Sequence, residues 1–218
     1  MGSKRFPYQS LGILRQFIRE RTPVEQCEFC SAELPSEHNH LIELSNGQLI
    51  CACGACAVLF SSQSRGKYRK VPERIRFLPD FQMTDVQWDS LMIPIGMAFL
   101  FNSTTARRVV AIYPSPAGAM ESLLTLESWE EIVQGNPSLK EMEPDVEALL
   151  INRVGNVREY YIVPIDECYK LVGLIRIHWR GLSGGSEVWA EIERFFSSLK
   201  EKSVGMSSTS IPGGEYNA

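Results

Sequence analysis

The sequence predicts an α+β protein with a small zinc-ribbon-like module of four cysteines attached to a mixed, largely antiparallel sheet domain that has C-terminal helices. Cysteines in paired CxxC spacing gather between positions 27 and 56. Strand-like and helix-like segments then follow one another without strict alternation, which favours α+β over α/β. We therefore divide the chain into an N-terminal helix (1–22), the cysteine module (23–64), the α+β domain (65–202) and a disordered tail (203–218).

The first two predicted elements are a short helix and a β-hairpin. Apolar residues recur at helical spacing before Pro23, which predicts an amphipathic helix ahead of the module. The Asn-Gly pair at 46–47 lies between the apolar-rich runs 40–44 and 48–53. Such a pair is a strong hairpin signal, so we expect a hairpin between the two CxxC motifs.

The α+β domain begins with a helix and two strands. Thr84 and Gln87 have the spacing of a capping box, so a short helix is expected there. The runs 93–102 and 106–114 are rich in Ile, Val and Phe and predict neighbouring strands. Ser115 and Pro116 suit an N-cap and a first helical position, which predicts a helix from Pro116 onward.

The remaining elements are two strands between helices. One helix is expected to end at Gly135, with Pro137 beyond it. Strands are expected near 146–154 and 159–164, and helices at 165–179 and 187–200 with the loop 180–185 joining them. Cys168 lies on the apolar stripe of the first of these two helices and is interpreted as a core cysteine.

The four cysteines Cys27, Cys30, Cys53 and Cys56 form the predicted metal site. Each CxxC loop offers two thiolates, and two such loops complete the tetrahedron that zinc prefers. Four thiolates leave no open coordination position, so the metal is expected to stabilise the module rather than to catalyse. Iron in the same cage would make a rubredoxin-like one-electron carrier, and residue spacing does not separate the two metals.

Three further residues are possible additional ligands: Cys51, His38 and His40. In a continuous strand Cys51 and Cys53 point to the same side, so Cys51 could lie beside the metal or replace Cys53. We retain Cys53 because CxxC is the usual chelating spacing. A hydrogen bond to a sulfur or to the turn backbone is the preferred interpretation for the histidines.

The charge is distributed unevenly. Residues 1–76 carry eleven Lys and Arg against seven Asp and Glu, whereas the rest of the chain carries eleven against nineteen. The basic run 65–76 could contact an acidic protein surface or nucleic acid, although a solvated linker or a charged edge strand is the plainer interpretation. The net charge of -4 argues against nucleic acid.

Nothing in the sequence points to catalysis or to a membrane. Cys168 and His178 lie ten residues apart on one predicted helix and cannot meet. The glycine-containing loops lack the sequence motifs of phosphate-binding loops. The longest apolar run, 91–101, is about half of a membrane span, and no signal peptide is recognisable. We expect a cytoplasmic protein that is not an enzyme.

Several segments resemble an uncharacterised bacterial family over about residues 23–202, among them CEFCSAELPSEHNHLIEL, LICACGACAVLF, VVAIYPSPAGAMESLL and YIVPIDECYKLVGLIRIHWRGLSGG. Members of that family are often encoded beside uptake nickel-iron hydrogenases. The resemblance implies that the five cysteines of the module act as a unit and that the YPSPAG segment is more than a helix start. It also implies a hydrogenase accessory role, with a hydrogenase subunit or maturation factor as the partner. The expected contact residues are Arg65, Lys67, Arg69, Lys70, Tyr113 and Ser115.

Overall fold

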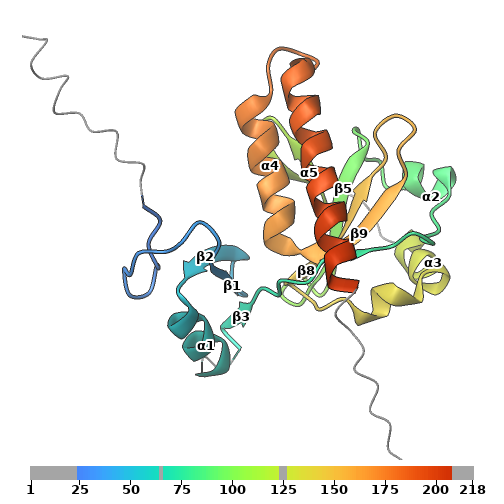
Figure 1. The fold of residues 1–218 in the computed structure, drawn as a ribbon. Coiled ribbons are helices and arrows are strands. Elements are labelled where there is room, and N and C mark those ends of the chain that lie inside the picture. The colour runs from blue at the N-terminus through green and yellow to red at the C-terminus, as the bar shows by residue number, and fades with distance from the viewer. Residues whose placement is uncertain (1–23, 64–65, 123–126, 208–218) are drawn as a thin grey trace, which may run out of the picture.

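The computed structural model describes residues 24–63, 66–122 and 127–207, which form a small sheet module beside a larger sheet domain (Figure 1). The predicted N-terminal helix at 1–22 and the end of the predicted tail, 208–218, lie outside the described residues. No helix among the described residues is long and apolar enough to cross a bilayer.

The cysteine module contains a three-stranded antiparallel sheet and one helix. The predicted hairpin is confirmed as β1 (Asn39–Glu43) and β2 (Gln48–Ala52), and helix α1 (Gly54–Gln63) follows it. The third strand, β3 (Tyr68–Lys70), pairs with β1, so the strand order is β2-β1-β3. The basic run therefore begins as an edge strand of the module, and the module's sheet extends beyond the expected boundary at residue 64.

The larger domain is built on a six-stranded sheet in the order β4-β9-β8-β5-β6-β7, and every neighbouring pair is antiparallel. The predicted α+β class is thereby confirmed. The strands are β4 (Arg76–Phe77), β5 (Met97–Ser103), β6 (Arg108–Ser115), β7 (Gly118–Glu121), β8 (Glu147–Asn152) and β9 (Glu159–Pro164).

Helices cover both faces of this sheet because its central strands are apolar on both sides. Helices α4 (Ile165–His178) and α5 (Gly185–Ser207) pack side by side on one face, over Phe99, Leu150 and Tyr161 (Figure 1). The other face carries Leu100, Leu149 and Ile162. It is covered by α2 (Asp85–Ser90), α3 (Glu127–Gly135) and a 3₁₀ turn, Pro137–Glu141. The capping box of α2, the end of α3 at Gly135 and the burial of Cys168 on α4 are confirmed.

Two expected boundaries differ from the structure. The helix predicted from Pro116 is wrong, because residues 115–118 turn the chain from β6 into β7. The Ser115 hydroxyl accepts a hydrogen bond from the Ala117 amide, as in an N-cap, but Gly118 has φ of +125° and sends the chain back along the sheet. Helix α5 also starts at Gly185 and continues to Ser207, past the expected start of the tail.

The module and the sheet domain share β1 between two cores. Strand alternation buries Leu41 in the small core of the module and its neighbour Ile42 in the large core under α4 and α5. Arg74, which follows β3, donates to the fully buried carboxylate of Glu147 with distances of 2.7 and 3.0 Å. These contacts hold the module against the sheet domain.

Candidate metal centre

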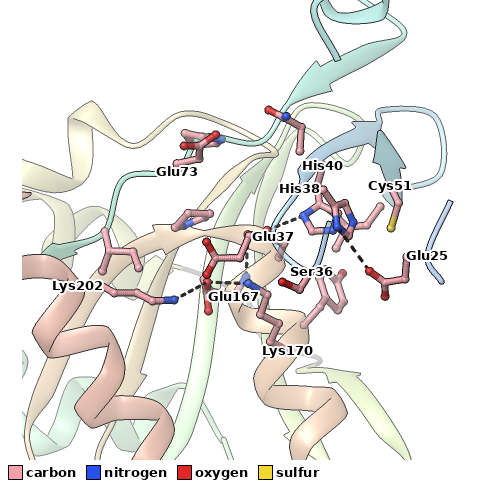
Figure 2. Close-up of a pocket in the computed structure, with 17 residues that line it drawn as sticks. Glu25, Ser36, Glu37, His38, His40, Cys51, Glu73, Glu167, Lys170 and Lys202 are labelled. Atoms are coloured by element: carbon pink, nitrogen blue, oxygen red, sulfur yellow. Dashed lines mark hydrogen bonds and ion pairs between the residues drawn. The ribbon is translucent and has the colours of Figure 1, made fainter. Parts of the chain in front are cut away.

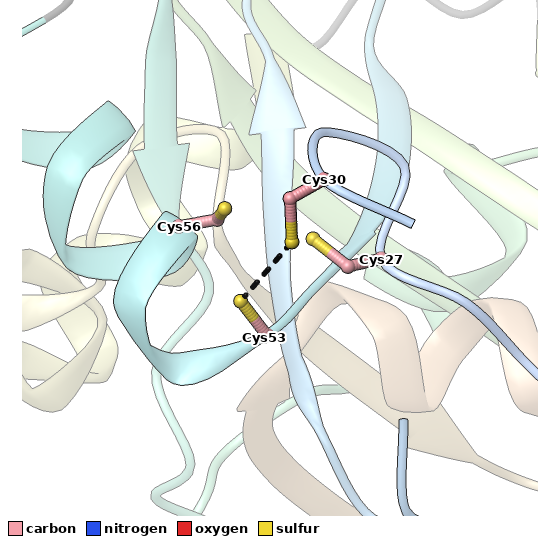
Figure 3. Close-up of side chains that lie close together, drawn as sticks. All are labelled: Cys27, Cys30, Cys53 and Cys56. Atoms are coloured by element: carbon pink, nitrogen blue, oxygen red, sulfur yellow. Dashed lines mark hydrogen bonds between the residues drawn. The ribbon is translucent and has the colours of Figure 1, made fainter. Parts of the chain in front are cut away.

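Two short loops bring the sulfurs of Cys27, Cys30, Cys53 and Cys56 together, so that all four lie within 4.8 Å of one another (Figure 3). Six free thiols are present among the described residues, four of them in this cluster. These four residues are the ligands predicted from the sequence. The structure brings them together from two separate segments, since Cys30 and Cys53 are 23 positions apart in the chain.

Local hydrogen bonding shapes the first loop. The Ser31 amide donates to the Cys27 carbonyl at 2.7 Å, and the Cys27 amide donates to the Ala32 carbonyl at 2.8 Å. Ser31 has φ of 60°, a left-handed conformation that reverses the chain directly after Cys30. Both sulfurs of the loop are thereby turned to the same side.

The second loop is the junction between β2 and α1. Strand β2 ends at Ala52, so Cys53 leaves the strand direction, and Cys56 lies in the first turn of α1. The Ala57 amide donates to the Cys53 carbonyl at 2.8 Å and continues the helix from there. The helix start therefore sets the distance between these two cysteines.

The spacing of the sulfurs suits a four-coordinate metal. A tetrahedron with metal-sulfur bonds of about 2.3 Å has edges of about 3.8 Å. The Cys30 and Cys53 sulfurs are 3.8 Å apart. A zinc or an iron ion therefore fits between them, and the distance does not distinguish the two metals.

The surroundings of the sulfurs favour negative charge at one of them and oppose it at another. Burial raises the pKa of Cys27, but hydrogen bonds from the backbone at Cys53, Phe29 and Cys30 outweigh burial and bring this pKa down to about 6. Burial and the neighbouring sulfurs raise the pKa of Cys56 to about 12. Four thiolates this close together need a cation to neutralise them, and a metal ion supplies that charge.

The core around the cage is small. Apart from cysteines and alanines, its buried members are Leu34, Leu41 and Ile50. Phe29 stacks on Phe60 with ring centroids 4.0 Å apart, and both rings pack against this core. So small a core is typical of modules whose folding depends on a bound metal.

The structure separates Cys51 from the four-cysteine cage. Cys51 lies opposite His40 in the hairpin, and its sulfur groups with a nitrogen of His40 and one of His38, again within 4.8 Å. Leu41 and Ile50 point to the cage side of the hairpin, whereas His40 and Cys51 alternate to the side of α4. The expectation that Cys51 and Cys53 share a side fails because β2 ends between them.

Asp166 is the residue of this region that the sequence did not single out as a site residue. Its carboxylate accepts a hydrogen bond from His40 Nδ1 at 2.9 Å across the junction between module and sheet domain. In the sequence it has the position of a helix cap, and a separation of 126 residues hides the contact. The pairing of His40 with Cys51 depends on the hairpin register, which the Asn-Gly pair alone did not give, because residues 44–47 form a four-residue connection between Glu43 and Gln48.

Most of the basic run has partners within the chain. Lys67 lies 3.2 Å from Glu43, Arg69 lies 3.3 Å from Asp145, and Lys70 lies 3.9 Å from Glu73. Further along, Arg74 and Arg76 pair with the buried Glu147 and with surface glutamates at 2.7–3.9 Å. Arg69 and Arg74 therefore help to attach the module to the sheet domain, whereas Lys67 and Lys70 have local partners. Arg65 lies outside the described residues.

The other predicted contact residues, Tyr113 and Ser115, are half-buried in β6 beside its turn to β7. The exposed residues of this turn are Pro116 and Ala117. The turn is held by the Ser115 hydroxyl, which bonds the Ala117 amide at 3.1 Å and the Gly118 carbonyl at 3.0 Å. It leaves Pro116 and Ala117 exposed between the end of β6 and the start of β7.

Comparison with known proteins gives a family and no activity. A family model described as "Family of unknown function (DUF5947)" matches residues 26–203, which include both the cysteine module and the sheet domain. No curated protein and no solved structure matches the chain.

Proposed function

The chain belongs to the family of unknown function DUF5947, and from its site we propose that it is a zinc-binding, non-catalytic accessory protein that acts by binding another protein. The observation that carries this proposal is the closed cage of four cysteine sulfurs within 4.8 Å of one another. A cage of this kind gives the metal no free position for water or substrate. A metal ion held in this cage would stabilise the module, and with it the surface that binds the partner.

The position of the cage supports a structural role. It lies behind β1 and β2, and the other side of the same hairpin packs on the sheet domain through Ile42. Ordering of the hairpin by the metal therefore also orders the junction. A structural zinc contributes on the order of 10–16 kcal/mol of apparent binding energy, which is available for folding such a module.

Metal analysis tests the first part of the proposal. The protein is purified without added metal, treated with EDTA and analysed for metal content and visible absorption. About one chelator-resistant equivalent of zinc, without colour, supports the structural site. Iron with visible thiolate absorption bands would instead support a rubredoxin-like electron carrier.

The partner in this proposal is a hydrogenase subunit or a hydrogenase maturation factor in the cytoplasm. It rests on the resemblance to bacterial proteins encoded beside nickel-iron hydrogenases. The turn at 115–118 is the surface we assign to this contact, because Pro116 and Ala117 are exposed and two hydrogen bonds of the Ser115 hydroxyl hold the turn. The basic run is less suited, because its described side chains already pair with acidic residues of the chain.

Copurification from the native host tests the partner. Tagged wild-type protein is expected to recover a hydrogenase component, and Ala117→Arg is expected to reduce that recovery at least several-fold. Val157→Arg is the matched control, since Val157 is exposed in the loop between β8 and β9. Equal recovery with both variants would contradict the placement of the contact, and recovery of no hydrogenase component would contradict the partner.

A further inference from the structure

A second cluster of potential ligands lies on the other side of the hairpin from the four-cysteine cage. It consists of His38, His40 and Cys51, whose ligand atoms lie within 4.8 Å of one another. The two imidazole rings have centroids 4.7 Å apart. Figure 2 shows the three side chains grouped at one end of a cavity between the module and α4.

Hydrogen bonding fixes the tautomer of both histidines. His38 Nδ1 lies 3.0 Å from the Pro35 carbonyl, which can only accept, so Nδ1 carries the proton. His40 Nδ1 likewise lies 2.9 Å from the Asp166 carboxylate. In each neutral ring the lone pair is then on Nε2, which is the arrangement found in metal-binding histidines whose other nitrogen bonds a carbonyl or a carboxylate.

One of these nitrogens is buried without a partner. The His38 side chain is only 5% exposed, and its Nε2 atom has no hydrogen-bond partner among the described residues. A buried polar atom without a partner costs about 1–3 kcal/mol, so its presence calls for an explanation. A metal ion coordinated by this nitrogen supplies one.

The ligand set and its surroundings indicate which kind of metal this is. Two imidazoles and one thiolate suit first-row transition ions of the zinc type rather than Mg²⁺ or Ca²⁺, which prefer oxygen. Bonds of about 2.0–2.3 Å need ligand atoms about 3.3–3.6 Å apart. The three atoms lie within 4.8 Å of one another, so metal binding requires them to move closer together. Three protein ligands leave the fourth position of a tetrahedron open.

His38, His40 and Cys51 all line a cavity of about 780 Å³. Five acidic residues and two lysines line this cavity, and both lysines lie within 4 Å of Glu167. The excess of carboxylates attracts cations and disfavours an anionic substrate. Solvent and an incoming chelating group can reach the metal from this side, which is the requirement for exchange.

We propose that His38, His40 and Cys51, with Asp166 orienting His40, form a second, exchangeable site for a divalent transition-metal ion, distinct from the closed cage. The site joins the module to α4, because His40 belongs to β1 and Asp166 to the first turn of α4. The protein then holds one metal permanently and a second one reversibly, as a protein that receives or delivers a metal ion does.

Zinc binding by the full-length protein tests this site. After saturation with Zn²⁺ and gel filtration, we expect two equivalents, of which EDTA removes one. His38→Ala combined with His40→Ala is expected to abolish the EDTA-labile equivalent and to leave the resistant one. His178→Ala is the matched control, since this third histidine pairs with Glu187 at 2.9 Å outside the cluster, and it should keep both equivalents.

Asp166→Asn separates a metal site from a merely structural cluster. It preserves the shape of the side chain but weakens the orientation and basicity of His40, so the labile affinity should fall by about 10- to 100-fold. Circular dichroism shows whether each variant folds, and Cys51→Ser replaces the double variant if that one does not. A folded wild-type protein that binds only one zinc, or a folded double variant that still binds two, would overturn the second site.

These results are distinguishable from failure of the proposed function. Loss of the EDTA-resistant equivalent bears on the four-cysteine cage, whereas loss of the labile equivalent bears on His38, His40 and Cys51. Cobalt substitution gives an independent readout, because a site with one thiolate has weaker sulfur-to-metal charge-transfer absorption than a site with four. The labile cobalt is expected to have the weaker absorption.

Discussion

Replacement of Cys27 by serine is expected to weaken the structural metal site by two to three orders of magnitude. Cys27 is 1% exposed, and its sulfur lies with the other three in the cage. If a structural zinc contributes about 10–16 kcal/mol through four similar ligands, one ligand accounts for about 2.5–4 kcal/mol. This loss corresponds to a decrease in affinity of about 10²- to 10³-fold.

The same change is expected to unfold part of the module. The three large aliphatic side chains of its core, Leu34, Leu41 and Ile50, contribute about 5–9 kcal/mol together, which is less than the zinc contributes. Without the metal, the first cysteine loop and α1 should therefore open before the sheet domain does. The sheet domain keeps its own two buried clusters, one on each face of its sheet.

Competition with a zinc-binding dye measures the affinity, and hydrogen exchange read by mass spectrometry measures the opening. Cys168→Ala is the matched control, since Cys168 is fully buried on the core-facing side of α4 and lies outside both ligand clusters. It should lower the unfolding temperature without releasing metal. Wild-type affinity in Cys27→Ser, or unchanged protection of residues 54–63 in that variant without metal, would refute the reasoning.

Three further predictions concern the junction, the sheet and the pH dependence of the cage. Glu147→Gln weakens the hydrogen bonds that a fully buried carboxylate accepts from Arg74 and from the Glu143 amide. It should therefore lower the free energy of unfolding in urea by about 2 kcal/mol. An unchanged urea midpoint would contradict the role of the Arg74 and Glu147 pair. Gly96→Ala places a Cβ 2.7 Å from the Arg153 carbonyl oxygen and should cost about 1–3 kcal/mol, whereas Gly135→Ala, whose Cβ meets nothing within 4 Å, should cost nothing. Because the pKa of Cys27 is lowered from 9.0 to about 6, its ionised form stabilises the fold fully above pH 9.0 and loses this effect as the pH falls toward 6. A dye assay between pH 8 and 5 should therefore record metal release that steepens below about pH 6, and retention at pH 5 equal to that at pH 8 would contradict it.

Features that depend on neighbouring residues were predictable from the sequence. The CxxC spacing identified the four cage cysteines, and the Asn-Gly turn gave the hairpin between them. The capping box at Thr84 and the end of α3 at Gly135 were likewise predicted at the right residues. Each of these features is decided by hydrogen bonds or steric preferences within a few residues, so a short stretch of sequence contains the information.

The helix expected at Pro116 shows the limit of such local signals. A serine hydroxyl that accepts a bond from an amide two or three residues on can start a helix or close a turn. At Ser115 the choice was made by Gly118 and by the pairing of β7 with β6. The Ser115-Pro116 sequence alone does not reveal the energy gained when β7 pairs with β6.

The sequence by itself determined the fold class, the cage cysteines and the hairpin. Only the tertiary structure decided that Cys51 faces away from the cage, that Asp166 meets His40, and that Arg69 and Arg74 pair with acidic residues of the sheet domain. The reason is that each of these outcomes depends on where a strand ends or on contacts between residues far apart in the sequence. Arg74 and Glu147, for example, are 73 positions apart. Local spacing selects the ligands, whereas packing of the module on the sheet domain decides which of them meet.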